Sequence, residues 1–242
     1  MKSLIITDMH GDDPRAVIEH HLANGVEKLV CLGDYDTPQV LKTIRKLKIP
    51  KILIVGNHDF HYVKRYGLTS RDMKMDAGGY ADLWNEHPAE KEFVQKAIAQ
   101  PNQNAGILVS EKVRKRMLAY VHGSLLGNDT EDPDVPGFVW GRMRNADKIV
   151  ANFTEMDRLG FEILFRGHDH VSAVFTRAKS DKENPYIMER DGYMHDRVLL
   201  KASGLHIVSV GAFYHGEYAV FDDKKMEVRF HRDVYQFKRQ GP

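Results

Sequence analysis

The chain has 242 residues, and the 42% that are hydrophobic are enough to bury one sizeable core. Lys and Arg number 35 against 34 Asp and Glu, so a formal charge of +1 gives no general attraction to nucleic acid or to anionic membranes. No apolar run approaches the ~18 residues of a membrane span, which argues against a membrane protein and favours a cytoplasmic one.

The first 55 residues predict alternating strands and helices. A helix is expected from Pro14 to Asn24, where Gly25 stops it, and a second from about Pro38 to Lys48. Apolar runs predict strands at residues 2–7, 28–32 and 51–55. A β-α-β-α-β order implies that these three strands lie parallel in one sheet. Cys31, the single cysteine, falls within such a run, so we expect a buried small hydrophobe there.

Residues 60–106 interrupt this alternation. Polar, glycine-containing sequence from Thr69 to Gly79 leads into helical pieces, the clearest from Glu90 to Gln100. We interpret this stretch as an insertion, or lid, that covers the loop edge of the sheet within a single domain spanning residues 1–242. Met73, Met75 and Trp84 are expected to pack against the core rather than to contact substrate.

The remaining sequence predicts one more helix and many strands. An amphipathic helix is expected from Ala146 to Leu159, stopped by Gly160. Strands are predicted at residues 107–110, 117–121, 161–166, 172–177, 197–201, 206–210, 217–221 and 226–231. We expect the second half to form a largely antiparallel sheet packed on the first. The predicted fold class is α/β, a two-sheet β-sandwich flanked by helices in four layers, α-β-β-α.

Polar side chains follow five of the predicted strands, at the point where each strand ends. Open α/β sheets keep their binding crevice outside the carboxyl ends of parallel strands, so we expect these side chains to converge. The five motifs are Asp8-Met9-His10-Gly11, Gly33-Asp34, Gly56-Asn57-His58-Asp59, His122-Gly123 and Gly167-His168-Asp169-His170.

Seven residues of these motifs are of types that bind metal ions. Two carboxylates, one amide and four imidazoles suit Mn²⁺, Fe, Zn²⁺ or Ni²⁺, and seven ligands fit two ions that share a carboxylate better than one ion. Singly, five of the residues have an alternative structural explanation as turn residues, helix caps or hydrogen-bonded core histidines: Asp8, Asp34, Asn57, His122 and His168. His170, two residues after His168, is harder to explain in this way. The seven are Asp8, His10, Asp34, Asn57, His122, His168 and His170.

The motifs Asp-x-His, Gly-Asp, Gly-Asn-His-Asp, His-Gly and Gly-His-x-His occur in this order between residues 8 and 170. This order resembles the calcineurin-like metallophosphoesterase superfamily, and the chain looks most similar to its small bacterial and archaeal phosphodiesterases. The resemblance implies two divalent metal ions, Mn²⁺ first, with Fe, Zn²⁺, Ni²⁺ or Mg²⁺ as alternatives. It implies that one ion is held by Asp8, His10 and His170. It implies that the other is held by Asn57, His122 and His168, and that Asp34 bridges the two.

The resemblance also implies a mechanism. Hydroxide bridging the two ions would attack the phosphoester in line, with the metal ions polarising the phosphoryl oxygens. His58 matches the histidine that the family places near the leaving group, where an imidazolium would protonate the departing alkoxide. We expect a carboxylate, Asp36 or Asp59, to hold His58 charged and oriented. His215 follows a loop that could face the metal ions, and its role is left open.

One departure from the superfamily bears on the substrate. The eukaryotic-type protein phosphatases follow Gly-Asp with Val-Asp-Arg-Gly, whose arginine grips the phosphate, whereas Asp34 is followed by Tyr35-Asp36-Thr37-Pro38. A dianionic monoester would lose its bidentate clamp unless an arginine comes from elsewhere, such as Arg15, Arg142 or Arg144.

We therefore expect a phosphodiesterase acting on a small phosphoester or nucleotide-type substrate. A phosphomonoesterase or a nucleotide pyrophosphatase is the alternative within enzymes. A binding scaffold that has lost its metal ions is disfavoured because every ligand position is filled. A nuclease of the Mre11 kind is disfavoured by the neutral charge, which gives no strong nucleic-acid signal.

Overall fold

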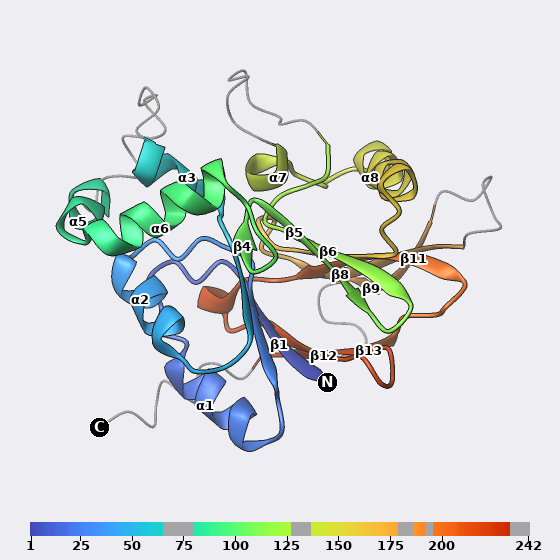
Figure 1. The fold of residues 1–242 in the computed structure, drawn as a ribbon. Helices are drawn as coiled ribbons and strands as arrows, with labels where there is room; N and C mark the ends of the chain where they lie inside the picture. The colour runs from blue at the N-terminus through green and yellow to red at the C-terminus, as the bar shows by residue number, and fades with distance from the viewer. Residues whose placement is uncertain (65–79, 127–136, 179–185, 192–195, 233–242) are drawn as a thin grey trace.

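Two β-sheets form the centre of the molecule in the computed structural model, which describes residues 1–64, 80–126, 137–178, 186–191 and 196–232 (Figure 1). The strands of the first sheet lie in the order β10 (Arg197–Leu199), β13 (Glu227–His231), β12 (Tyr218–Asp222), β1 (Lys2–Ile6), β2 (Lys28–Cys31), β3 (Lys51–Ile54) and β4 (Ala105–Gly106). Those of the second lie in the order β5 (Leu108–Val113), β6 (Arg116–Val121), β7 (Ile163–Arg166), β11 (Gly204–Val210), β8 (Ser172–Ala178) and β9 (Ile187–Asp191).

Helices cover the outer faces of both sheets, which confirms the predicted α-β-β-α layering (Figure 1). The helices on the side of the first sheet are α1 (Arg15–Ala23), α2 (Pro38–Lys46), α3 (Asn57–Lys64), α5 (Tyr80–Glu86) and α6 (Pro88–Ala99). On the side of the second sheet lies α8 (Ala146–Leu159), while α7 (Gly137–Trp140) packs between the two sets of helices, with Val139 in the cluster of the first sheet and Phe138 against that of the second. Among the described residues no helix is long and apolar enough to cross a membrane.

Helix α8 has the bounds that the sequence predicted, and its two ends explain why. The side chain of Asn145 accepts a hydrogen bond from Lys148 N at 3.0 Å, which satisfies a backbone donor of the first turn. At the other end Gly160 adopts φ 76°, a left-handed conformation that glycine reaches without steric cost. These two local signals lie in the sequence itself, so the boundaries follow from it.

The strands β1, β2 and β3 pair in parallel, as the β-α-β-α-β pattern predicted. The expectation that the second half forms a sheet of its own is wrong. β12 and β13 join the first sheet, where β12 runs antiparallel to β1, while β11 lies in the second sheet between β7 and β8. The free edge of β1 would otherwise expose unpaired backbone groups, and β12 satisfies them.

The apolar side chains lie in three layers that follow this architecture. Ile5 and Val30 of the first sheet and Phe165 and Val208 of the second belong to one buried cluster between the sheets. The other two clusters lie between each sheet and its helices. Cys31 is fully buried, and burial raises the pKa of its thiol above the usual range, which agrees with the expected packing role. The core thus holds both sheets rigidly at the edge where the strand-end motifs lie.

The insertion is helical where the structure describes it. Helices α5 and α6 pack on α3 and α2, and Trp84 of α5 is fully buried in the core of the first sheet, as expected. The stretch from Thr69 to Gly79, with Met73 and Met75, lies outside the described residues. The expectation that this insertion roofs the loop edge therefore stays a prediction.

Two local expectations need correction. The segment after β3 was expected to be a loop, but Asn57 begins helix α3. Its first turn is stabilised by a distant residue, because Asp34 Oδ1 accepts a hydrogen bond from His58 N at 3.0 Å. Strand β9 was not predicted; it pairs antiparallel with β8 at the edge of the second sheet. Both features depend on partners far away in the sequence.

Candidate metal centre

Five strand ends meet at one edge of the sandwich. They are the carboxyl ends of β1, β2 and β3 in the first sheet and of β6 and β7 in the second, and the strands within each set run parallel. Backbone hydrogen bonds join neighbouring ends, for example from Asp8 N to Gly33 O at 3.1 Å and from Gly167 N to His122 O at 3.0 Å. The two sheets are joined by His168 N, which donates to Asp8 Oδ2 at 3.0 Å.

Six non-glycine residues at these strand ends have a left-handed backbone. Such a conformation costs about 1–3 kcal/mol per residue and persists where the surrounding structure enforces it, most often at functional sites. Five of the six are among the seven predicted metal ligands. The six are Asp8 (φ 51°), His10 (φ 47°), Asp34 (φ 55°), Asp36 (φ 59°), His168 (φ 69°) and His170 (φ 59°).

Two glycines allow the strand ends to approach each other closely. A Cβ atom on Gly56 would overlap the carboxylate of Asp34, and one on Gly167 would overlap the hydroxyl of Thr7 and lie 2.6 Å from Asp8 Oδ2. Side chains other than hydrogen do not fit at such positions. Gly56 and Gly167 therefore allow the carboxylates of Asp34 and Asp8, which belong to two other motifs, to enter the site.

The first group of candidate ligands consists of Asp8, His10 and His170. Asp8 Oδ2 accepts hydrogen bonds from Thr7 Oγ1 at 2.7 Å and from His168 N at 3.0 Å. Its other oxygen, Oδ1, is buried without a hydrogen-bond partner in the described part of the chain. It lies 3.1 Å from His170 Nε2 and 4.0 Å from His10 Nε2, and these nitrogens are 3.3 Å apart. An orphaned carboxylate oxygen beside two imidazole nitrogens fits a divalent cation.

The second group consists of Asn57, His122, His168 and Asp34. His122 Nε2 lies 2.9 Å from Asn57 Oδ1 and 3.3 Å from Asp34 Oδ2, and His168 Nδ1 lies 2.8 Å from Asn57 Oδ1. His122 Nδ1 donates to Leu32 O at 2.7 Å, so a neutral ring would turn the lone pair of Nε2 towards two oxygens. A cation at this place, a proton or a metal ion, removes that repulsion. The donor set therefore fits a metal ion.

The two groups adjoin. Asp8 Oδ1 lies 3.8 Å from His122 Nε2, so the carboxylate of Asp8 faces nitrogens of both groups. Asp34 Oδ2 lies near His122 on one side and 3.8 Å from His58 Nε2 on the other. Asp8, His10 and His170 form one set whose ligand atoms lie within 4.8 Å of one another, and Asp8, Asp34 and His122 form another. Asn57 and His168 adjoin the second set through the contacts of Asn57 Oδ1 with His122 and His168.

His58 and Asp36 form an ion pair beside the ligands. His58 Nδ1 lies 2.7 Å from Asp36 Oδ1, and Asp36 Oδ2 lies 3.0 Å from His10 Nδ1. Asp36 therefore orients both imidazoles. The expectation that Asp59 orients His58 is corrected, because its carboxyl oxygens accept hydrogen bonds from the backbone N–H groups of Asp34, Tyr35 and Gly56 at 2.9–3.0 Å, and it acts on the pKa of His58 only through its charge. Asp59 braces the two strand ends instead.

Charges within this site separate the pKa values of its histidines. Burial opposes the charged form of His58, but the charge of Asp34 and the contact with Asp36 raise its pKa to about 10. Burial likewise opposes the charged form of His122, and Asp34 and Asp8 raise its pKa to about 9. Burial and the nearby charge of His122 lower the pKa of His168 to about 3. In the protein without metal, His58 and His122 are therefore cationic at neutral pH and His168 is neutral.

The carboxylates respond to the same contacts. Burial acts to raise the pKa of Asp8 and of Asp34, but the neighbouring histidines, His122 foremost, together outweigh it and hold the pKa of both carboxyls well below the usual range. Asp59 differs, since burial and the charge of Asp34 raise its pKa to about 7. Asp8 and Asp34 are thus ionised at neutral pH, as metal ligands must be.

Tyr214 is a site residue that sequence reasoning missed. It lies in the 3-10 turn Phe213–His215 after β11, where Tyr214 N donates to Asp8 O at 3.3 Å. Its hydroxyl lies 3.1 Å from His170 Nδ1, and its ring packs edge-on against His10 at 4.7 Å between centroids. The only feature of the sequence that could have indicated Tyr214 is that its segment follows the end of a predicted strand, at residues 206–210. His215, left open from the sequence, lies next to it with its ring 5.9 Å from that of His170.

Other residues support the site from behind. Trp84 Nε1 donates to Asp36 O at 2.8 Å, which ties the insertion to the carboxylate between His10 and His58. The buried guanidinium of Arg166 donates to Asp169 Oδ2 at 2.7 Å and to Gly123 O at 2.6 Å, joining two of the motifs. Such contacts hold the ligating turns in place.

The three arginines considered as a phosphate clamp have carboxylate partners. Arg142 and Arg144 lie 3.9 and 3.5 Å from Asp169 Oδ1, and the exposed Arg15 donates to Asp13 at 2.6 Å.

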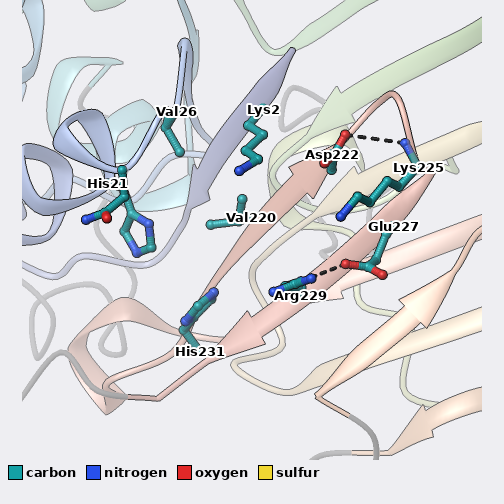
Figure 2. A pocket seen from close by; sticks show the side chains of 10 residues that line it. Lys2, His21, Val26, Val220, Asp222, Lys225, Glu227, Arg229 and His231 are labelled. Carbon is teal, nitrogen blue, oxygen red and sulfur yellow. Dashed lines mark hydrogen bonds and ion pairs between the residues drawn. The ribbon is translucent and has the colours of Figure 1, made fainter.

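Two hollows differ in their relation to this centre. One lies between α1 and the strands β12 and β13, lined by His21, Val220, Arg229 and His231 among others, and includes none of the predicted ligands (Figure 2). The other includes none of the predicted ligands either, but it adjoins the centre, because Asp169 of its wall lies between His168 and His170 in the chain. Only the second is placed to act together with the metal ligands.

Residues 1–189 match the family model of the calcineurin-like phosphoesterase superfamily domain. The chain belongs to this superfamily. As a calcineurin-like phosphoesterase it is a hydrolase that acts on phosphoesters, and its Asp and His clusters are candidate sites for the metal ions on which the family depends. No curated protein sequence matches the chain.

Solved structures share the fold of this phosphoesterase. A metallophosphoesterase from Sphaerobacter thermophilus superposes with a TM-score of 0.62 at 22% identity, covering 99% of this chain and 93% of its own. The protein PH1004 from Pyrococcus horikoshii superposes with a TM-score of 0.58 at 14% identity, covering 99% of this chain and 91% of its own. At these identities the likeness concerns the fold.

Proposed function

We propose that this phosphoesterase hydrolyses phosphodiesters with two divalent metal ions, of which Mn²⁺ is the leading candidate. The observation that carries the proposal is the convergence of seven ligand-type side chains in two adjoining groups. In the first, Asp8 Oδ1 is orphaned beside two imidazoles, and in the second, His122 Nε2 faces two oxygens. Both arrangements favour a cation.

Each group would hold one ion. Asp8, His10 and His170 would bind the first. Asn57, His122 and His168 would bind the second, with Asp34 between the two. Ions bound there would supply an activated water nucleophile and would neutralise charge on the phosphoryl oxygens.

His58 is proposed as the general acid. Its Nδ1 is committed to Asp36 at 2.7 Å, which leaves Nε2 as the nitrogen that would give a proton to the leaving oxygen. Burial opposes the charged form of the ring, but the charge of Asp34 and the contact with Asp36 raise its pKa to about 10. The ring is therefore protonated at neutral pH in the metal-free protein. Asp36 acts on His58 by positioning it and by favouring its charged form.

The charges around the centre support a diester over a monoester. A monoester brings a second negative charge, and the segment Tyr35-Asp36-Thr37-Pro38 after Asp34 contains no arginine that could clamp it. Arg142 and Arg144 are engaged by Asp169, at 3.9 and 3.5 Å from its Oδ1. A singly charged diester needs less compensation at the site. We therefore propose a small phosphodiester, including nucleotide-type molecules, as the substrate class.

The test combines metal analysis with kinetics. Protein purified without chelator should carry about two transition-metal ions per chain and should lose turnover on chelation. With the best metal, kcat/KM should be higher for bis(p-nitrophenyl) phosphate than for p-nitrophenyl phosphate. Because both release the same leaving group, the comparison reports the difference between diester and monoester. A clear preference for the monoester would overturn the diester proposal in favour of a phosphomonoesterase. Preference for a nucleoside diphosphate or triphosphate would favour a nucleotide pyrophosphatase.

A further inference from the structure

The hollow beside the metal centre has the size and lining of a small-molecule site. Its volume is about 430 Å³, and it lies on the outer face of the second sheet next to the segment that joins α7 to α8. Small-molecule pockets in proteins are mostly apolar and span about 300–1,000 Å³. Its walls include Met143, Asp169, Val171, Phe175, Tyr186 and Met188.

One turn serves both the hollow and the metal centre. In the turn between β7 and β8, His168 and His170 belong to the ligand groups, while Asp169 and Val171 line the hollow. Consecutive Cα atoms lie about 3.8 Å apart, so the two spaces are separated by little more than the backbone of this turn. A group attached to a phosphorus atom at the metal centre would therefore be close to the hollow.

The hollow leaves apolar side chains exposed. Val171 and Met188 are 48% and 46% exposed, although large hydrophobic residues of the described chain are mostly buried. Tyr186 packs edge-on against Phe175, with 5.5 Å between ring centroids, and adds an aromatic wall. Exposed apolar surface grouped around a cavity commonly marks a binding site, and aromatic and thioether groups favour planar rings.

We infer that this hollow binds an aromatic ester group of the phosphodiester whose phosphorus lies at the metal centre. The inference rests on the proposed function and deepens it, because it names the class of ester group that the chain selects. Val171 and Met188 would cover the faces of the ring.

The test compares two esters with the same leaving group. Phenyl p-nitrophenyl phosphate and methyl p-nitrophenyl phosphate both release p-nitrophenolate and differ only in the group that is retained. Burial of a phenyl ring predicts a kcat/KM for the phenyl ester higher on the order of 10-fold. Phenylphosphonate and methylphosphonate, which have no ester bond to break, give a second readout by calorimetry, and the phenyl compound should bind tighter on the order of 10-fold.

Neighbouring side chains on β9 provide a matched pair of variants. Met188 lines the hollow, whereas Ile187 is 68% exposed and does not. Successive side chains of a strand point to opposite faces. Met188→Gln should lower both phenyl-to-methyl ratios by about 3-fold or more, since a polar side chain replaces apolar contact. Ile187→Gln should leave both ratios as they are in the unchanged protein.

The outcomes separate the inference from the function on which it rests. If both esters are hydrolysed at similar kcat/KM, or if Met188→Gln and Ile187→Gln change the ratios equally, the hollow is not the site of the ester group, and the phosphodiesterase proposal stands. If neither ester is hydrolysed with any of the candidate metal ions, the proposed function itself is overturned, and this inference with it.

Discussion

Replacement of His58 by alanine tests the proposed proton transfer directly. The ring lies between Asp36, 2.7 Å from its Nδ1, and Asp34, 3.8 Å from its Nε2. Burial opposes its charge, but these carboxylates raise its pKa to about 10, so that at pH 7 nearly every molecule of the metal-free protein carries the acid form. Its loss should therefore remove the full contribution of a general acid.

The size of the effect depends on the leaving group. General acids contribute roughly 10²–10⁴-fold, or about 3–5 kcal/mol of the barrier, where the leaving group needs a proton. His58→Ala should lower kcat/KM by this factor for a diester with an alkyl leaving group and by much less for bis(p-nitrophenyl) phosphate, because p-nitrophenolate leaves without a proton. Metal content, measured by elemental analysis, should not change. His87→Ala, a histidine outside the site, is the matched control.

The pH dependence gives the sign of the proposed role. A general acid works in its protonated form, so turnover of the alkyl diester should fall as pH rises through the pKa of His58. Asp36→Asn removes a group that raises this pKa and should move the fall to lower pH. Equal losses on alkyl and aryl substrates in His58→Ala would refute proton donation and leave His58 as a residue that positions the substrate.

Three further predictions follow from the contacts of single residues. Asp34→Asn should lower the content of both metal ions, whereas His170→Ala should lower one; equal content of two ions in Asp34→Asn would contradict its bridging position. Burial opposes the charged form of His122, but the carboxylates Asp34 and Asp8 raise its pKa to about 9. Because the ring must lose its proton to bind metal, the apparent metal affinity should rise about tenfold per pH unit between pH 7 and 9. Titration calorimetry would show this rise, and an affinity that does not change with pH would exclude His122 as a ligand. The same raised pKa stabilises the metal-free fold below pH ~6.5, and this contribution is lost as pH rises through about 9. Trp84→Phe leaves the buried carbonyl of Asp36 without the indole donor that lies 2.8 Å from it. The free energy of unfolding, measured by urea denaturation, should fall by about 1–3 kcal/mol. An unchanged value would mean that the carbonyl has found another donor.

The sequence by itself determined the parallel strands β1 to β3, the helix α8 and the place of the candidate site. These features depend on local signals: apolar runs of strand length, an asparagine cap before α8, Gly160 after it, and polar residues directly after strands. Parallel strands bring their carboxyl ends to one edge whatever the rest of the chain does, so the convergence of the five motifs follows from their order.

Tertiary structure decided which distant segments meet. The sequence does not show that β12 pairs with β1, because a strand carries no mark of its partner beyond its pattern of apolar residues. Likewise Asn57 begins a helix because Asp34, from another strand end, accepts the hydrogen bond of His58 N, and Asp59 turns out to bind backbone amides rather than His58. Tyr214 reaches His170 only because β11 lies beside β7 and β8. Contacts of this kind require that the chain first be folded, since groups far apart in sequence come within hydrogen-bond distance only when packing fixes both of them.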